Sequence, residues 1–162
     1  METVDIDDLD RCILYCLQGD ARGVSASSIA EKVDVSARTV RNRIHELETE
    51  GVIRGYQLDV DYETAGYQLH TMVICTAPIS KREEIAQNAL EVPGVIEVTE
   101  IMTGDQNLFV EVVGTDGDDL SRITQELNDL GLDVKDEDII RRGYTTRFHQ
   151  FDRCGDPSSD GE

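Results

Sequence analysis

The sequence contains no tryptophan, only three prolines and three lysines, and few aromatic residues. No apolar run approaches the ~20 residues that a membrane-spanning helix needs. The first ten residues are acidic and carry no basic-then-apolar pattern, so no secretory signal is expected. Four scattered cysteines do not make the framework of a small disulfide-rich domain. These absences exclude membrane and secreted classes and predict a protein of the cytoplasm.

Negative charge dominates what is present. The chain has 34 acidic and 15 basic residues and a formal net charge of −19. High acid content with so little lysine is typical of a proteome adapted to high intracellular salt, where screening makes self-repulsion cheap. We therefore expect a halophilic source, with an ordinary acidic protein as the alternative.

The cysteines suggest buried thiols in a reducing compartment. Cys12 and Cys16 lie four residues apart on a predicted helix and so share one face. A metal site would need two further ligands, and the three histidines are scattered. We predict no disulfide and no metal site, and keep a redox-sensing Cys12/Cys16 pair as the alternative.

The first 52 residues have the pattern of three short helices. Asp5 or Asp7 can cap the first helix, which ends at Gly19. Ser25 can cap the second, and Ser36 the third, which runs from about 37 to 50. A three-residue turn between the second and third helices predicts a helix-turn-helix. Residues 52–58 follow as a predicted strand, either a wing or a link.

The third helix has a face rich in hydrogen-bond donors. Between Ser36 and His45 there are three arginines and no acidic residue. Such side chains suit phosphates and base edges, so this helix is the predicted recognition helix. A solvated helix face with chance clustering of arginine is the alternative.

The second half alternates strands and helices. Strands are predicted at 69–77, 95–103, 108–114 and 134–140. A helix at 81–90 is expected to be capped by Ser80, and a second helix to be capped by Asp118 or Asp119 and to end at Gly131. The order is βαββαβ, a ferredoxin-like arrangement. Residues 144–148 could add a further strand.

The fold class is therefore α+β in two domains. The predicted division is a helix-turn-helix domain at 1–55, a connection at 56–68, a ferredoxin-like domain at 69–151 and a disordered acidic tail at 152–162.

This order of elements resembles the Lrp/AsnC (feast/famine) family of transcription regulators. The resemblance rests on the opening helix around Asp7, Asp10 and Leu17, the segments 28–33 and 36–48, and the closing 50–56, EGVIRGY. Pro93-Gly94-Val95 and Thr103-Gly104-Asp105 resemble the ligand-regulated half of the family. The likeness covers about residues 5–150.

The resemblance implies a homodimer or higher homo-oligomer that binds pseudo-palindromic double-stranded DNA, is not an enzyme and needs no cofactor. On the third helix and after it, we expect base contacts from Arg38, Thr39, Arg41 and Asn42, and phosphate contacts from Ser36, Arg43 and Arg54.

The resemblance also implies a small effector, commonly an amino acid, bound in the second domain. Gly104 would allow close backbone approach, Asp105 would meet the ammonium group, and Asn107 would add a polar contact. Asn107 stands where the family commonly has an acid. An ordinary Gly-Asp turn is the alternative.

Two other functions stay open. A sirohaem-decarboxylase-like enzyme shares this architecture and would need cationic residues and a histidine, for which His70, His149 and Arg141, Arg142 and Arg147 are available. A protein-assembly module without DNA binding is the second. No phosphate loop, catalytic triad or metal motif is present in the sequence.

Overall fold

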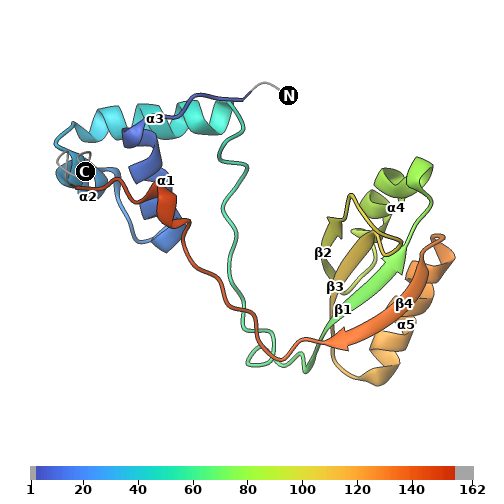
Figure 1. Ribbon diagram of the computed structural model, residues 1–162. Coiled ribbons are helices and arrows are strands. Elements are labelled where there is room, and N and C mark those ends of the chain that lie inside the picture. Colours follow the sequence, from blue (N-terminus) through green and yellow to red (C-terminus); the bar gives the residue numbers. More distant parts are fainter. Residues whose placement is uncertain (1–2, 156–162) are drawn as a thin grey trace, which may run out of the picture. The chain divides into compact units, whose positions relative to one another are not determined.

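The computed structural model describes residues 3–155 and divides the chain into two compact units. One unit joins the chain up to Leu58 with the chain from Tyr144 onward, and the other spans Asp59–Gly143. The second unit is thus inserted in sequence between two parts of the first (Figure 1). Among the described residues, no helix has the length and apolar character to span a membrane.

Three helices form the first unit: α1 (Asp8–Asp20), α2 (Ala26–Val33) and α3 (Ala37–Thr49). Asp7, Ser25 and Ser36 cap them by accepting a backbone N–H three residues on. These caps satisfy N–H groups that the first turn leaves free, which explains why each helix begins where it does. The predicted starts and the turn at residues 34–36 are confirmed. Asp34 adopts the left-handed conformation that closes α2.

The core of this unit is small and apolar. It is built around fully buried Cys12, Ile13 and Val40, with Ile29 and Leu47 nearly so. These side chains come from all three helices, so their burial fixes α3 against α1 and α2. Gly51, with φ of +75°, takes the chain out of α3 in a conformation that favours glycine.

The predicted strand at 52–58 is absent. Val52 and Ile53 pack against the core, but the chain then runs extended, with no strand beside it in the described part of this unit. A strand needs a partner for its backbone groups, and alternating apolar residues alone do not supply one.

The C-terminal segment belongs to the first unit, which corrects the predicted boundaries. Residues 144–148 form no strand, and a short 3-10 helix, η2 (His149–Phe151), places Phe151 against the helical core. Arg147 lies over the ring of Tyr15, 4.1 Å from its centroid, and the Phe148 N–H donates to Gln18 Oε1 at 3.1 Å. Residues 152–155 of the predicted disordered tail are in place on this unit. The rest of that tail lies outside the described residues.

The second unit is a four-stranded antiparallel sheet in the order β2-β3-β1-β4. The strands are β1 (Leu69–Thr76), β2 (Val95–Glu100), β3 (Leu108–Gly114) and β4 (Asp133–Ile139). Helices α4 (Arg82–Ala89) and α5 (Gly117–Asp129) cover one face (Figure 1). This is the ferredoxin-like arrangement that the sequence predicts.

Alternation along the strands sorts the side chains of the sheet. Val73, Leu108, Val110 and Val112 are fully buried against the helices. The intervening residues face the other side, which the helices leave open.

Two predicted helix starts in this unit are wrong. Ser80 does not cap α4; it lies inside a 3-10 turn, η1 (Ile79–Lys81), that leads into the helix. α5 is capped by Asp116, which accepts the Asp119 N–H at 2.9 Å, and not by Asp118 or Asp119. Neighbouring aspartates have the same local capping chemistry, so the conformation of the preceding chain determines which of them caps the helix.

Candidate nucleic-acid interface

A single exposed stripe runs along α3. Arg38, Arg41, Asn42 and His45 are all exposed and occupy positions i, i+3, i+4 and i+7 of the helix. That spacing places them on one face, opposite buried Val40 and Leu47. Neither Arg38 nor Arg41 has an ion-pair partner among residues 3–155. The stripe therefore offers uncommitted donors of the type that reads base edges.

Ser36 and Thr39 shape the start of this helix. The Ser36 hydroxyl accepts the Thr39 N–H at 3.0 Å and lies 2.8 Å from the Thr39 hydroxyl. Both side chains are exposed. Ser36 thus acts first as a cap, and the first turn keeps its remaining N–H groups near the surface, where a phosphate is favoured.

Arg43 forms hydrogen bonds and ion pairs within the protein, which corrects its predicted role as a phosphate contact. Its Nε donates to Asp10 Oδ1 at 2.9 Å and its Nη2 to Asp10 Oδ2 at 2.8 Å. Nη2 also pairs with Asp7. The hydrogen bonds to Asp10 raise the pKa of Arg43, against the opposing effect of partial burial. The guanidinium thus ties α3 to the start of α1.

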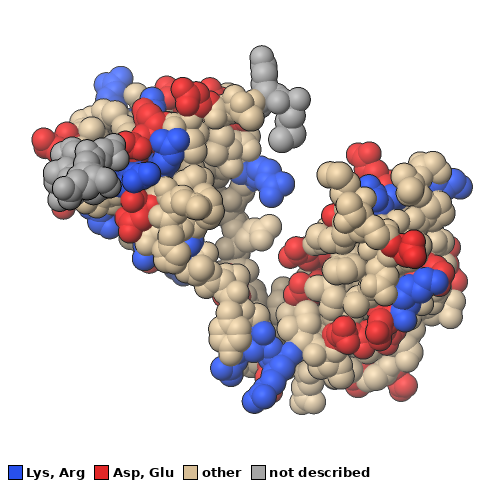
Figure 2. All heavy atoms as spheres, viewed as in Figure 1, with Lys and Arg blue, Asp and Glu red and all other residues tan. Residues whose placement is uncertain are grey.

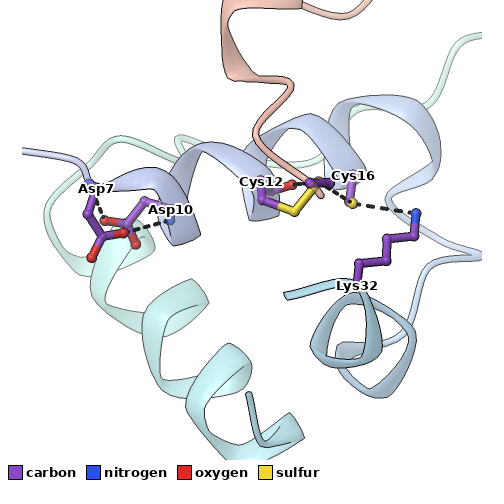
Figure 3. The surroundings of a disulfide bond; sticks show 6 residues. Asp7, Asp10, Cys12, Cys16 and Lys32 are labelled. Atoms are coloured by element: carbon purple, nitrogen blue, oxygen red, sulfur yellow. Dashed lines mark hydrogen bonds between the residues drawn. A yellow bond between two sulfur atoms is a disulfide. The ribbon is translucent and has the colours of Figure 1, made fainter. Parts of the chain in front are cut away.

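Arg43 also affects the pKa of Asp7. Partial burial raises the pKa of Asp7, but hydrogen bonds from the Asp10 N–H and from Arg43, together with the Arg43 charge, outweigh it and hold this pKa below its ordinary value. Asp7 and Asp10 also close a reciprocal capping box, in which each carboxylate accepts the other's N–H (Figure 3).

Arg54 is exposed in the extended chain after α3. Two residues on, the Tyr56 hydroxyl donates to Glu48 Oε1 at 2.9 Å and returns the chain to the end of the helix. Burial, followed by the hydrogen bond and charge of Glu48, raises the pKa of Tyr56. The predicted phosphate contact of Arg54 stays a prediction.

The predicted effector turn lies between β2 and β3 in the second unit. Gly104 has φ of +99°, and a Cβ placed on it would meet no atom nearer than 3.9 Å. Asp105 is exposed, and its carbonyl accepts the Thr76 hydroxyl at 2.7 Å. The backbone at Gly104 is thus open and Asp105 is exposed, and their role in effector binding stays a prediction.

Asn107 is not available to an effector, contrary to its predicted role. It is 5% exposed. Its Oδ1 accepts the Ala77 N–H at 2.8 Å and its Nδ2 donates to the Ala77 carbonyl at 2.9 Å. The Asn107 carboxamide thus bonds both backbone polar groups of Ala77, just after β1, in place of a neighbouring strand. These bonds fix the end of the turn to β1.

The cysteines also differ from expectation. Cys12 is bonded to Cys154, 142 residues away in sequence, where no disulfide was predicted. Cys16, the other member of the alternative redox-sensing pair, is a free buried thiol. Phe148 and Phe151, spaced three apart just before Cys154, are the sequence signal that this segment packs against the helices.

Acidic side chains outnumber basic ones on this molecule. In the view of Figure 2 they are spread over the sheet unit, with basic side chains at only a few points. On α3 the acidic residues are confined to its last turns, at Glu46 and Glu48. The first two turns of α3 thus carry basic and no acidic side chains, on a molecule whose net charge is negative.

Comparison with known proteins agrees with this geometry. A family model described as winged helix-turn-helix DNA-binding matches residues 6–54, the segment that contains α1, α2 and α3.

Relatives match over most of the chain. The HTH-type transcriptional regulator LrpA1 of Halobacterium salinarum is 36% identical over 139 residues, which are 86% of this chain and 89% of that protein. The crystal structure of MtbAldR superposes with a TM-score of 0.73 at 26% identity, covering 86% of this chain and 97% of that one.

A third likeness concerns the fold. The transcriptional regulator NMB0573 from Neisseria meningitidis, crystallised in complex with L-Met, has a TM-score of 0.70 at 22% identity and covers 89% of this chain and 96% of that one. Sequence and architecture agree along the length of the chain, and the chain belongs to the Lrp/AsnC family of helix-turn-helix transcriptional regulators.

Proposed function

We propose that this regulator reads its DNA site through Arg38, Thr39, Arg41 and Asn42, with phosphates held by Arg54 and by the first turn of α3 at Ser36. The exposed stripe on α3 carries the proposal, because its arginines have no ion-pair partner in the described chain. Arg43 is left out, since it holds the unit together. The relatives reported above are named as regulators, and none of them supports the decarboxylase-like alternative.

A homodimer would present two such helices to one pseudo-palindromic site. The open face of the sheet supports this assembly. Its centre is apolar and half-buried, with Met72 and Ile74 on β1 beside Phe109 on β3. A second copy would complete the burial of this strip.

The chain is proposed to work in a salt-rich cytoplasm. If a dimer neutralised ~6 phosphates by counterion release alone, affinity would fall roughly eight decades between ~0.1 M and ~3 M salt. Net charge of −19 makes such binding harder still. Shape fit, base contacts and cations held between acidic surface and DNA would then supply the affinity.

The effector is proposed to be an amino acid at the turn of Gly104 and Asp105. The open backbone suits a carboxylate and the free Asp105 side chain suits an ammonium group. The L-Met complex of the Neisseria relative supports this class of ligand. Titration calorimetry with a panel of amino acids tests it, and Asp105→Asn should abolish any heat that the wild type gives.

The test of DNA binding uses the region upstream of the protein's own gene at ~2 M KCl. Arg38→Ala/Arg41→Ala should lose specific binding, and Arg11→Ala, which removes a half-buried arginine paired with Asp8 in the same unit, should retain it. Equal binding by all three proteins would refute the proposed role of α3. A steep fall in wild-type affinity with rising KCl would refute the proposed salt mechanism.

A further inference from the structure

Three cysteines meet where the C-terminal segment crosses α1. Cys12 and Cys16 lie on successive turns of the helix (Figure 3), and Cys154, near the other end of the chain, is bonded to Cys12. All three Sγ atoms lie within 4.8 Å of one another. The Sγ atoms of Cys16 and Cys154 are 3.6 Å apart.

We propose that, when the Cys12–Cys154 disulfide is reduced, Cys12, Cys16 and Cys154 bind one thiophilic divalent cation, of which Zn²⁺ is the type. A Zn–S bond of about 2.3 Å places the sulfurs of a tetrahedral site about 3.8 Å apart. The Cys16–Cys154 separation of 3.6 Å is already close to that value, and opening of the Cys12–Cys154 bond lets its two sulfurs move apart to complete the triangle. This inference does not depend on the proposed DNA and effector contacts.

Charge balance favours a dication. Cys12 is fully buried and Cys16 is 6% exposed, so three thiolates could not stay there uncompensated. The Lys32 Nζ lies 3.9 Å from Cys16 Sγ and points toward it (Figure 3). Three thiolates, one divalent cation and the Lys32 ammonium sum to zero.

The site also has access from solvent. A surface hollow of about 450 Å³ opens beside it, lined among others by Cys16, Lys32 and Asp20. It gives a metal ion a route of entry and leaves room for a water molecule as the fourth ligand, since three protein ligands leave a tetrahedral zinc one open position.

The chemistry balances with a thiol reductant. Two low-molecular-weight thiols give two electrons and two protons to the Cys12–Cys154 bond and leave as one disulfide. The metal then displaces the three cysteine protons as it binds. The disulfide would thus hold the C-terminal segment to α1 under oxidising conditions, and the metal would hold it there under reducing conditions.

The alternative is exchange within the protein, in which the Cys16 thiolate attacks Cys154 and releases Cys12. A compact triangle favours a shared ligand at its centre, whereas exchange would need the three sulfurs nearly in line. The two possibilities predict different products.

The experiment titrates Co²⁺, as a spectroscopic probe, into the reduced full-length protein under argon. The expected result is one ion per chain, a thiolate-to-cobalt absorption band in the near ultraviolet, and its loss when Zn²⁺ displaces the probe. Cys16→Ser and Cys154→Ser should lose the band. Cys75→Ser, which removes a buried thiol in the sheet unit, should keep it.

Cys16→Ser leaves the Cys12–Cys154 disulfide intact, so circular dichroism of its oxidised form separates loss of the site from loss of the fold. An unchanged band in Cys16→Ser, or no band in the wild type, overturns the proposal. Binding of Cu⁺ without Zn²⁺ overturns the assignment of a dication. A Cys16–Cys154 disulfide found by peptide mapping, with no metal uptake, favours exchange instead.

Discussion

Arg43 on α3 donates two hydrogen bonds to the carboxylate of Asp10 on α1, at 2.9 and 2.8 Å, and Asp10 is 5% exposed. The ion pair is bidentate, so it fixes the orientation of the two side chains as well as their distance. The recognition helix is therefore oriented from its inner side by an arginine, while the arginines on its outer side stay uncommitted.

Arg43→Ala should destabilise the helical unit by about 3 kcal/mol, because it leaves the buried Asp10 carboxylate without its cationic partner. Urea unfolding followed by helical circular dichroism measures the loss. Arg38→Ala is the matched control on the same helix and should unfold like the wild type. Equal stability of Arg43→Ala and Arg38→Ala would show that the Asp10 contact is dispensable.

Acid should weaken the same unit through Asp7. Its folded pKa lies below the ordinary value, so the stabilisation is complete above the unfolded pKa and is lost as pH falls through the folded one. Urea midpoints between about pH 6 and pH 3 should fall, and fall less in Asp7→Asn. Asparagine keeps the cap and removes the charge. Parallel curves for the two proteins would assign the acid sensitivity to other carboxylates.

Asn107→Ala should destabilise the sheet unit by about 2 kcal/mol, because both polar groups of Ala77 lose their buried partner. Hydrogen exchange at β1 and β3 measures the effect locally. Asn107→Asp should be similarly unfavourable, since it sets a carboxylate against the Ala77 carbonyl. A stable Asn107→Ala protein with altered effector binding would return Asn107 to the ligand site.

Dimerisation should strengthen with salt. Asp136 and Asp138 lie opposite Ile74 and Met72, and Glu97 lies opposite Glu111. The apolar strip on the open face is thus bordered by acids, which a second copy would bring close to its own. Screening removes that repulsion, so sedimentation at ~2 M KCl should show more dimer than at ~0.1 M.

The matched variant for that measurement is Asp136→Asn/Asp138→Asn. It should dimerise at low salt and depend less on KCl. A wild-type association constant that does not change with salt would place the interface elsewhere.

Local signals explain what the sequence predicts well. The helix-turn-helix follows from Ser25 and Ser36, whose caps are local, and from Gly51, which has to end α3. The sheet follows from strands with buried alternate residues. Helix starts in runs of acidic residues were less secure, because Asp116, Asp118 and Asp119 have the same local chemistry.

Contacts between distant residues explain what was missed. Helical periodicity places Arg43 near the inner edge of α3, but it does not predict that Asp7 and Asp10 of the first helix lie beside it. The role of Asn107 depends on Ala77, thirty residues earlier. The Cys12–Cys154 bond depends on the chain returning from the sheet unit to the helices. The exposure of Arg38, Arg41 and Asn42 on α3 was predictable, because it follows from helical periodicity alone and needs no distant partner.

The Cys12–Cys154 bond turns the polypeptide into a closed ring that contains the whole sheet unit. A single protease cut within residues 59–143 would open this ring without separating its halves. Under non-reducing electrophoresis the nicked protein would migrate as one species, and with a reductant it would resolve into two fragments. A regulator damaged in this way would keep both halves of its chain together until its disulfide was reduced.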